Sequence, residues 1–175
     1  MPELETLEDL LVEQLRDLYS AENQISKALP KMAKAASHPK LRQAFERHLK
    51  ETLTQRDRLA KIADMLGVKP TGHVCAAAKG LIEEASEFLS DSKKSPEEIR
   101  DAGLIANGNR VEHYEIAGYG TAVALAEKLG LDKAVKLLQQ TLAEEKATDE
   151  KLTALSEEVN DEAAALSVGA EEEEE

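Results

Sequence analysis

The sequence has no tryptophan, and its three tyrosines and two phenylalanines make up only 3% of the 175 residues. Hydrophobic residues nevertheless reach 42% of the chain. A core must therefore be built from leucine, alanine, isoleucine and valine, which suit packed helices. The length fits one domain that can bury a sizeable core. The composition predicts an all-α fold.

A basic patch, a long apolar run and a second cysteine are also absent. The net charge of -13 argues against binding to nucleic acid or to an anionic membrane surface, because the field of the protein repels phosphate. No apolar run is long enough to span a bilayer, and the acidic start "MPELETLEDL" does not resemble a signal peptide. The single Cys75 cannot form an intramolecular disulfide. We expect a cytoplasmic protein.

Capping and stop signals delimit four long helices and one short one. Thr6 can cap the first, Gly67 stops the second, and Ser95 with Glu98 predicts a capping box at the start of the third long helix. Asp132 can cap the last. The predicted helices cover residues 6–36, 39–66, 74–90, 95–129 and 132–159. We expect one domain over residues 1–165 and an acidic, disordered tail over residues 166–175.

The connections between these helices predict the topology. Short turns join the first long helix to the second and the third to the fourth, so each pair should form an antiparallel hairpin. About thirty residues separate the two hairpins, which is too long for a bundle turn and suits a crossover. Two hairpins joined by one long crossover are the ferritin-like four-helix arrangement.

All four long helices carry acidic or polar residues at the midpoint of their apolar seams. Glu22 lies between Leu18 and Ile25 in the first seam, and Glu112 and Glu115 interrupt the third. The second seam offers His48 and then either Glu51 or Thr52. The fourth offers either Glu144 or Glu145. Midpoints of long helices meet in a bundle, so these side chains should share one layer.

Several ionised carboxylates cannot share an apolar core without compensation, because lost hydration and mutual repulsion each cost several kcal/mol. The seams place no lysine or arginine at this level. Two divalent metal ions are the simplest compensation, since carboxylates and imidazole bind hard and borderline cations and can bridge two of them. The alternative is that one or two of these glutamates face solvent.

A weak internal repeat supports a symmetric site. Sliding the chain by 93 residues without a gap aligns Glu22 with Glu115 and Glu51 with Glu144, together with four pairs of apolar residues. Two related hairpins would place equivalent carboxylates symmetrically about two ions. This alignment favours Glu144 over Glu145.

Four segments carry a family resemblance: "DLYSAENQ", "AFERHLKETLTQ", "RVEHYEIAGYG" and "TLAEEKATDEKL". They resemble the YciF-like family of ferritin-like bacterial stress proteins over residues 4 to 160, nearly the whole chain. The resemblance implies a ferritin-like four-helix fold, a homodimer and a dinuclear, carboxylate-rich metal site of the rubrerythrin type. It also implies a link to stress responses, without a defined reaction. We expect the short crossover helix to be the dimer face.

Carried over by position, the resemblance implies ligands from all four long helices. The implied set is Glu22, Glu51, Glu112, Glu115 and either Glu144 or Glu145. The chain departs from the usual Glu-x-x-His pattern, because Thr54, Ala147 and Thr148 stand where histidines would be expected. His48 is the one seam histidine that could substitute, and its alternative role is that of a hydrogen-bonded core residue.

A site with few histidines is hard and negative, which favours iron, with manganese as the second choice. The expected function is the oxidation of ferrous iron or the reduction of a small oxidant, peroxide or oxygen. The sequence does not identify catalytic residues. The alternative is a metal-free helical scaffold or partner-binding dimer without catalysis.

Overall fold

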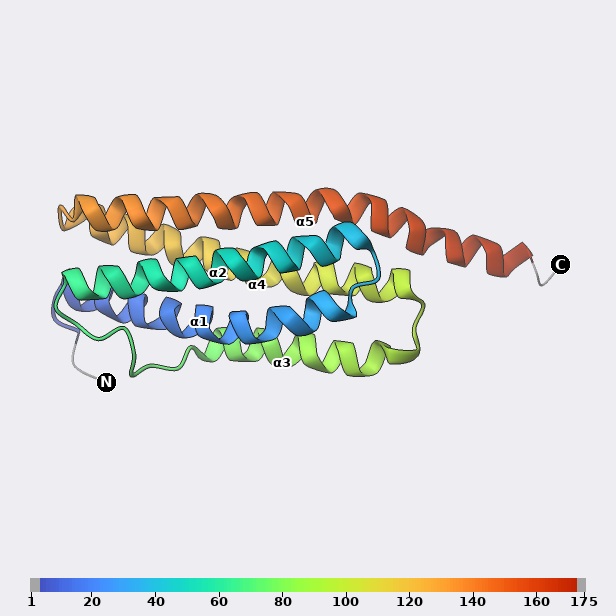
Figure 1. The fold of residues 1–175 in the computed structure, drawn as a ribbon, viewed down its shortest axis with the longest axis horizontal. Helices are drawn as coiled ribbons and strands as arrows, with labels where there is room; N and C mark the ends of the chain where they lie inside the picture. The colour runs from blue at the N-terminus through green and yellow to red at the C-terminus, as the bar shows by residue number, and fades with distance from the viewer. Residues whose placement is uncertain (1–3, 173–175) are drawn as a thin grey trace.

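A computed structural model describes residues 4–172 and contains five α-helices (Figure 1). Within these residues no strand is present. The helices are α1 (Leu7–Ala35), α2 (Pro39–Met65), α3 (Ala76–Asp91), α4 (Glu97–Lys128) and α5 (Asp132–Glu172), and a 3-10 turn, η1 (Ser92–Lys94), follows α3. The predicted all-α class is confirmed. In the described range, no helix is both long enough and apolar enough to cross a membrane.

The helix ends show which local signals act. Thr6 caps α1 through a capping box in which its hydroxyl accepts from the amide of Asp9 while the Asp9 carboxylate accepts from the Thr6 amide. Pro39 occupies the first position of α2, and Gly67 adopts a positive φ just after its end. These helix ends lie where the capping and stop signals in the sequence predict them.

The predicted capping box at Ser95 is wrong. The amide of Ser95 donates instead to the carbonyl of Ser92 at 3.0 Å, which closes the turn η1 and leaves Glu98 no free amide to accept from. Helix α4 begins after Pro96 without a side-chain cap. Similarly, α5 begins at Asp132 itself, so this residue lies in the first turn and not at the cap.

Helix α5 extends to Glu172, beyond the predicted end near Val159. The segment after Val159 is rich in alanine, the strongest helix former, and the Ala163 side chain is buried. The division into a domain of residues 1–165 and a tail of residues 166–175 stays a prediction. Residues 1–3 and 173–175 lie outside the described part.

The long helices pack as two pairs. Helix α1 packs along α2, and α4 packs along α5; these are the most extensive contacts between elements. Helix α2 also contacts α5, and α1 contacts α4, so the four surround a common interior. Helix α3 belongs to the connection between the pairs and lies against α1 and α4 (Figure 1).

The apolar core is divided into two clusters. One contains Leu11, Leu15 and Leu18 of α1 with Leu59 of α2 and Leu138 of α5. The other is built around the other half of the same helices; its members include Ile25, Leu29, Phe45, Leu104, Leu152 and Val159. Between the two clusters, every long helix presents its polar seam residues. The fold therefore places a polar layer at the middle of the bundle.

Helix α3 can approach α4 closely because Gly103 has no side chain. A Cβ atom at Gly103 would lie 1.9 Å from Cζ of Phe88, which sits on α3. We expect Gly103→Ala to destabilise the protein by about 1–3 kcal/mol, because the Phe88 ring must leave its place. Gly120→Ala is the matched control: its Cβ meets no atom within 4 Å. This control should stabilise the same helix by up to about 1 kcal/mol.

Urea unfolding of the two variants measures this difference. An equal effect of both substitutions would show that Phe88 is not held against Gly103. In a Phe88→Ala background the cost of Gly103→Ala should disappear, since no ring then opposes the added methyl group.

Candidate metal centre

Four side chains from three helices meet in the polar layer. His48 comes from α2, Glu112 and Glu115 from α4, and Glu145 from α5, and each offers one ligand atom within 4.8 Å of those of the others. All four are buried, with at most 2% of their surface exposed. They lie in the same helical seams as the buried leucines, so the packing that buries the leucines also brings these groups together.

Glu22 adds a buried carboxyl group to this layer from α1, the remaining long helix. Its side chain is fully buried, and Tyr119 donates a hydrogen bond from its hydroxyl to Glu22 Oε1. The negative charges of Glu145 and Glu144 act on its carboxyl group. Acidic residues from α1, α4 and α5 are buried in this layer, whereas α2 contributes His48 and Thr52, so the predicted convergence of acidic residues holds for three of the four long helices.

Most polar atoms of this layer lack a hydrogen-bond partner within residues 4–172. They include both carboxylate oxygens of Glu115 and of Glu145, and one oxygen each of Glu22 and Glu112. His48 Nε2 lies 3.2 Å from Glu112 Oε1, but neither ring nitrogen makes a hydrogen bond of acceptable geometry. Buried polar atoms in native proteins are almost always paired. Such a concentration of unpaired oxygens could hold a metal ion.

Burial also changes the acidity of these groups. Loss of hydration raises the pKa values of Glu22, Glu112 and Glu115 well above the usual value for glutamate, and the charges of neighbouring carboxylates raise them further. Burial raises the pKa of Glu145 to about 7. For His48, burial lowers the pKa to about 4. A neutral imidazole is the form that binds a metal ion.

Three of the predicted positions lie outside this cluster of four: Glu22 is buried in the same layer, and Glu51 and Glu144 are partly exposed. Glu51 is 22% exposed, and its carboxylate accepts from Arg47 Nε at 2.8 Å. Glu144 is 25% exposed, and Arg58 donates to both of its oxygens, at 2.5 and 2.8 Å. The preference for Glu144 over Glu145 at the seam is wrong: Glu145 is fully buried and Glu144 is not. Thr52, not Glu51, occupies the seam of α2.

Arg58 and Gln55 are polar neighbours that sequence reasoning missed. Arg58 is only 13% exposed and binds Thr141 as well as Glu144. Gln55 donates to Glu144 at 3.2 Å, while its own carbonyl oxygen stays unpaired in the interior. Gln55 could have been found from its place in the seam. Arg58 precedes Leu59 in that seam, and nothing in its position indicates that it reaches α5.

A second acidic group lies at the surface. His38, Glu158 and Glu162 come close enough to hold an ion, but the two glutamates are exposed and Lys40 already binds Glu158. Exposed acidic groups of this kind are common in proteins that bind no metal there. The buried layer is the stronger candidate site.

Comparisons with known proteins identify the family of this chain. Residues 6–165 match the model of a family described as a domain of unknown function, DUF892. Protein YciF of Escherichia coli strain K12 is 50% identical over 154 residues, which cover 87% of this chain and 92% of YciF.

Solved structures of related proteins are also similar to this chain. The crystal structure of the E. coli stress protein YciF has 48% identity and a TM-score of 0.86, with 90% of this chain and 99% of that chain covered. YcfI, a putative structural protein from Rhodopseudomonas palustris, has 47% identity and a TM-score of 0.82, with 87% and 96% covered. The chain therefore belongs to the DUF892 family of YciF-like proteins.

Proposed function

We propose that this protein is a ferritin-like carboxylate protein that holds two metal ions in the polar layer of its four long helices. Iron is the first choice of metal and manganese the second. The proposed reaction is the oxidation of ferrous iron coupled to the reduction of peroxide or oxygen. The arrangement of two helix pairs, joined by a connection that carries α3, supports the ferritin-like assignment.

The unpaired oxygens of Glu115 and Glu145 are the observation that carries this proposal. Both carboxyl groups are fully buried and lack a hydrogen-bond partner in the described part of the chain. A buried charge is tolerated only when it is paired or binds a metal. Across the layer, carboxylates outnumber imidazoles, and hard cations such as iron and manganese prefer this donor set.

Each residue of the layer has a role in this proposal. His48, Glu112, Glu115 and Glu145 would hold one ion directly, and Glu22 together with a bridging carboxylate would hold the second. Tyr119 holds Oε1 of Glu22 through its hydroxyl and leaves Oε2 free to bind. Arg58 keeps Glu144 outside the layer. Iron bound there would supply the electrons that reduce the oxidant.

The biological setting is part of the same proposal. The E. coli relative is described as a stress protein, and peroxide is a small oxidant that a buried iron site could remove under stress. We also propose that the protein acts as a homodimer in the cytoplasm. Light scattering of the purified protein tests whether it is a homodimer. A large hollow assembly would favour iron storage instead.

A metal-free scaffold is the second candidate, and the raised carboxyl pKa values favour it. Protonated carboxyl groups carry no charge, so a layer with several protons could be buried without metal. Such a protein would bind a partner or only support a dimer.

Elemental analysis separates the two candidates. Protein purified without a histidine tag is expected to contain about two iron or manganese ions per chain, as in other carboxylate bundles. Stopped-flow measurements on the iron-loaded protein should show peroxide consumption faster than that of free ferrous iron. Less than a tenth of an ion per chain, even after incubation with ferrous or manganous salts, would favour the scaffold.

A further inference from the structure

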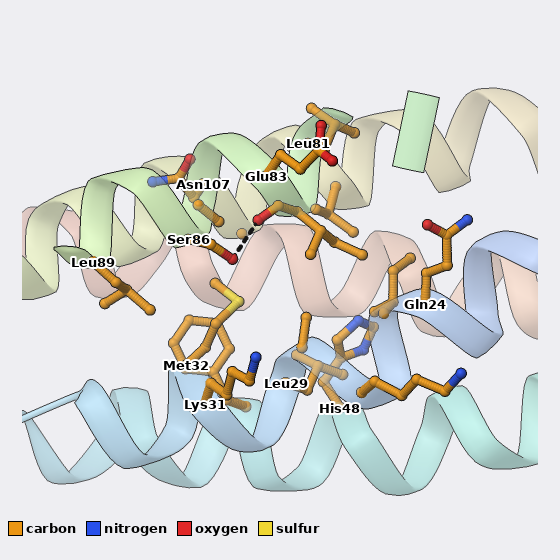
Figure 2. A pocket seen from close by; sticks show the side chains of 18 of the residues that line it. Gln24, Leu29, Lys31, Met32, His48, Leu81, Glu83, Ser86, Leu89 and Asn107 are labelled. Atoms are coloured by element: carbon orange, nitrogen blue, oxygen red, sulfur yellow. Dashed lines mark hydrogen bonds between the residues drawn. The ribbon is translucent and has the colours of Figure 1, made fainter. Parts of the chain in front are cut away.

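A cavity of about 320 Å³ opens between α1, α3 and α4, beside the polar layer (Figure 2). Its volume lies at the lower end of the range for small-molecule sites. The proposed metal chemistry needs only space for a small oxidant, so a cavity of this size requires a separate explanation.

The walls of the cavity are mostly apolar. Leu29 and Met32 line it from α1 and Leu81 and Leu89 from α3, and Figure 2 shows these side chains around the space. Further apolar lining comes from Ile25, Phe45, Ile82 and Val111. Such walls favour a ligand with an alkyl or other apolar body, because each Å² of apolar surface removed from water contributes roughly 25 cal/mol.

Three uncharged polar side chains along the walls already have partners. Asn107 donates to the carbonyl of Gly103 at 2.9 Å, and Gln24 donates to the carbonyl of Cys75 at 3.0 Å. Ser86 donates to the carbonyl of Ile82 at 2.7 Å, as the dashed line in Figure 2 shows. These three side chains already use hydrogen-bonding groups within the protein and do not indicate a polar ligand.

The two ends of the cavity differ in charge. His48 and Glu112 line it at the buried end, where each is 2% exposed and the His48 Nδ1 atom has no hydrogen-bond partner in the described part of the chain. Lys27 and Lys31 of α1 are exposed and line it at the surface. Neither lysine has an acidic partner within 4.0 Å among residues 4–172.

A third lysine at the cavity, Lys79 of α3, is already engaged by Glu83, at 3.5 Å. Lys27 and Lys31 therefore supply uncompensated positive charge at the opening of a cavity in a protein whose net charge is -13. Since the field of the whole protein repels anions, two free lysines beside an apolar cavity form a local exception. This pattern complements an anion that has an apolar body.

We propose that this cavity binds a free medium-chain alkyl carboxylate. The carboxylate lies at the surface between Lys27 and Lys31, the chain runs along the apolar walls, and its far end approaches His48 and Glu112. The reverse orientation would bury the ligand's carboxylate and leave Lys27 and Lys31 unpaired, which the loss of hydration of the carboxylate disfavours. The proposal concerns binding alone and holds whether or not the polar layer contains metal.

Isothermal titration calorimetry of the full-length protein with decanoate tests this site, with and without a chelator. Acetate has the acid without the chain, and decyltrimethylammonium has the chain with the opposite charge. We expect saturable binding of one decanoate per chain, no detectable binding of acetate, and weaker binding of decyltrimethylammonium. The chelator should not abolish decanoate binding, so failure of the metal proposal would not affect this result.

Two variants locate the ligand. Lys27→Gln with Lys31→Gln should weaken decanoate binding about tenfold, since two exposed ion pairs with the carboxylate are lost. The double variant Lys133→Gln with Lys136→Gln makes the same charge change on α5, away from the cavity, and should leave the affinity unchanged. Ala85→Leu fills the cavity from α3 and should prevent binding without lowering the melting temperature.

Three results would overturn the proposal. Decanoate that does not bind at millimolar concentration leaves the site without its ligand. Equal affinity for decanoate and decyltrimethylammonium would indicate unspecific adsorption of alkyl chains. Unchanged decanoate affinity in the Ala85→Leu variant would place the ligand elsewhere on the protein.

Discussion

Substitution of Glu145 by glutamine is expected to lower metal affinity by more than about 100-fold, the upper end for a group that merely supports a ligand. The amide keeps the shape of the side chain but removes its charge. Both Glu145 oxygens are buried and unpaired, so they are free to bind an ion. Metal content after dialysis against a fixed concentration of free metal measures the effect.

Glu144→Gln is the matched control, because it makes the same change one residue away. Arg58 already binds both oxygens of Glu144, so this variant should keep its metal. It should lose about 1 kcal/mol of stability with the ion pair. Loss of metal from the Glu144 variant alone would show that Glu144, and not Glu145, binds the ion. Metal retained by both variants would rule out a centre at this position.

The second large effect is a loss of stability of the metal-free protein as the pH rises from 6.5 to 8. A carboxyl group whose pKa is raised by folding stabilises the folded state below its unfolded pKa, and this contribution is lost as the pH rises through the folded value. For Glu145 the loss extends from the usual glutamate range, near 4.5, to about pH 7. For Glu22, Glu112 and Glu115 it extends further.

The pKa of His48 is shifted in the opposite direction, and its effect on stability falls in a different pH range. Folding lowers its pKa from 6.5 to about 4, so its contribution is present above pH 6.5 and is lost as the pH falls towards 4. Above pH 6.5 its imidazole is mostly neutral in both states. In this range the slope reports the carboxyl groups, each of which contributes up to about 1.4 kcal/mol per pH unit while it stays protonated.

Urea unfolding in the presence of a chelator measures this slope. Glu115→Gln should raise the stability of the metal-free protein at pH 8 and reduce the slope by about 1.4 kcal/mol per pH unit, because glutamine does not titrate. Glu51→Gln removes a carboxylate that is partly exposed and paired with Arg47, and should keep the wild-type slope. With metal bound, Glu115→Gln should instead destabilise the protein, since the ion loses a ligand.

A wild-type slope near zero without metal would contradict the burial of unpaired carboxyl groups. The same would follow if Glu115→Gln lowered the stability equally with and without metal. In that case Glu115 would act through packing and not through its charge.

The apolar seams could be predicted from the sequence because their periodicity is regular. The steps between seam residues alternate between three and four in every long helix. Followed strictly, this alternation passes from Thr141 to Glu145 and from His48 to Thr52, the residues that the structure buries. The helical class and the depth of the polar layer follow from this pattern, whereas the helix pairing follows from the short turns.

The choice between adjacent glutamates failed because sequence identity was given more weight than periodicity. The 93-residue repeat aligns the seam of α2 with the seam of α5, and within it Thr52 aligns with Glu145. The identical pair, Glu51 and Glu144, stands one position before each seam, where each residue is held by an arginine. Arginine side chains are long enough to reach several neighbours, so their partners could not be read from spacing alone.

The side chains of the polar layer come from two helix pairs, and this division has a consequence for how the chain folds. Contacts within each pair join segments that are close in sequence, and such contacts form early in folding. Three of its buried acidic groups, Glu112, Glu115 and Glu145, belong to the α4–α5 pair, whereas Glu22 and His48 belong to the α1–α2 pair and join them only when the pairs dock. Docking therefore buries a fourth carboxyl group against three that α4 and α5 have already gathered, so loss of hydration and repulsion oppose this step, and a bound cation or the uptake of protons would favour it.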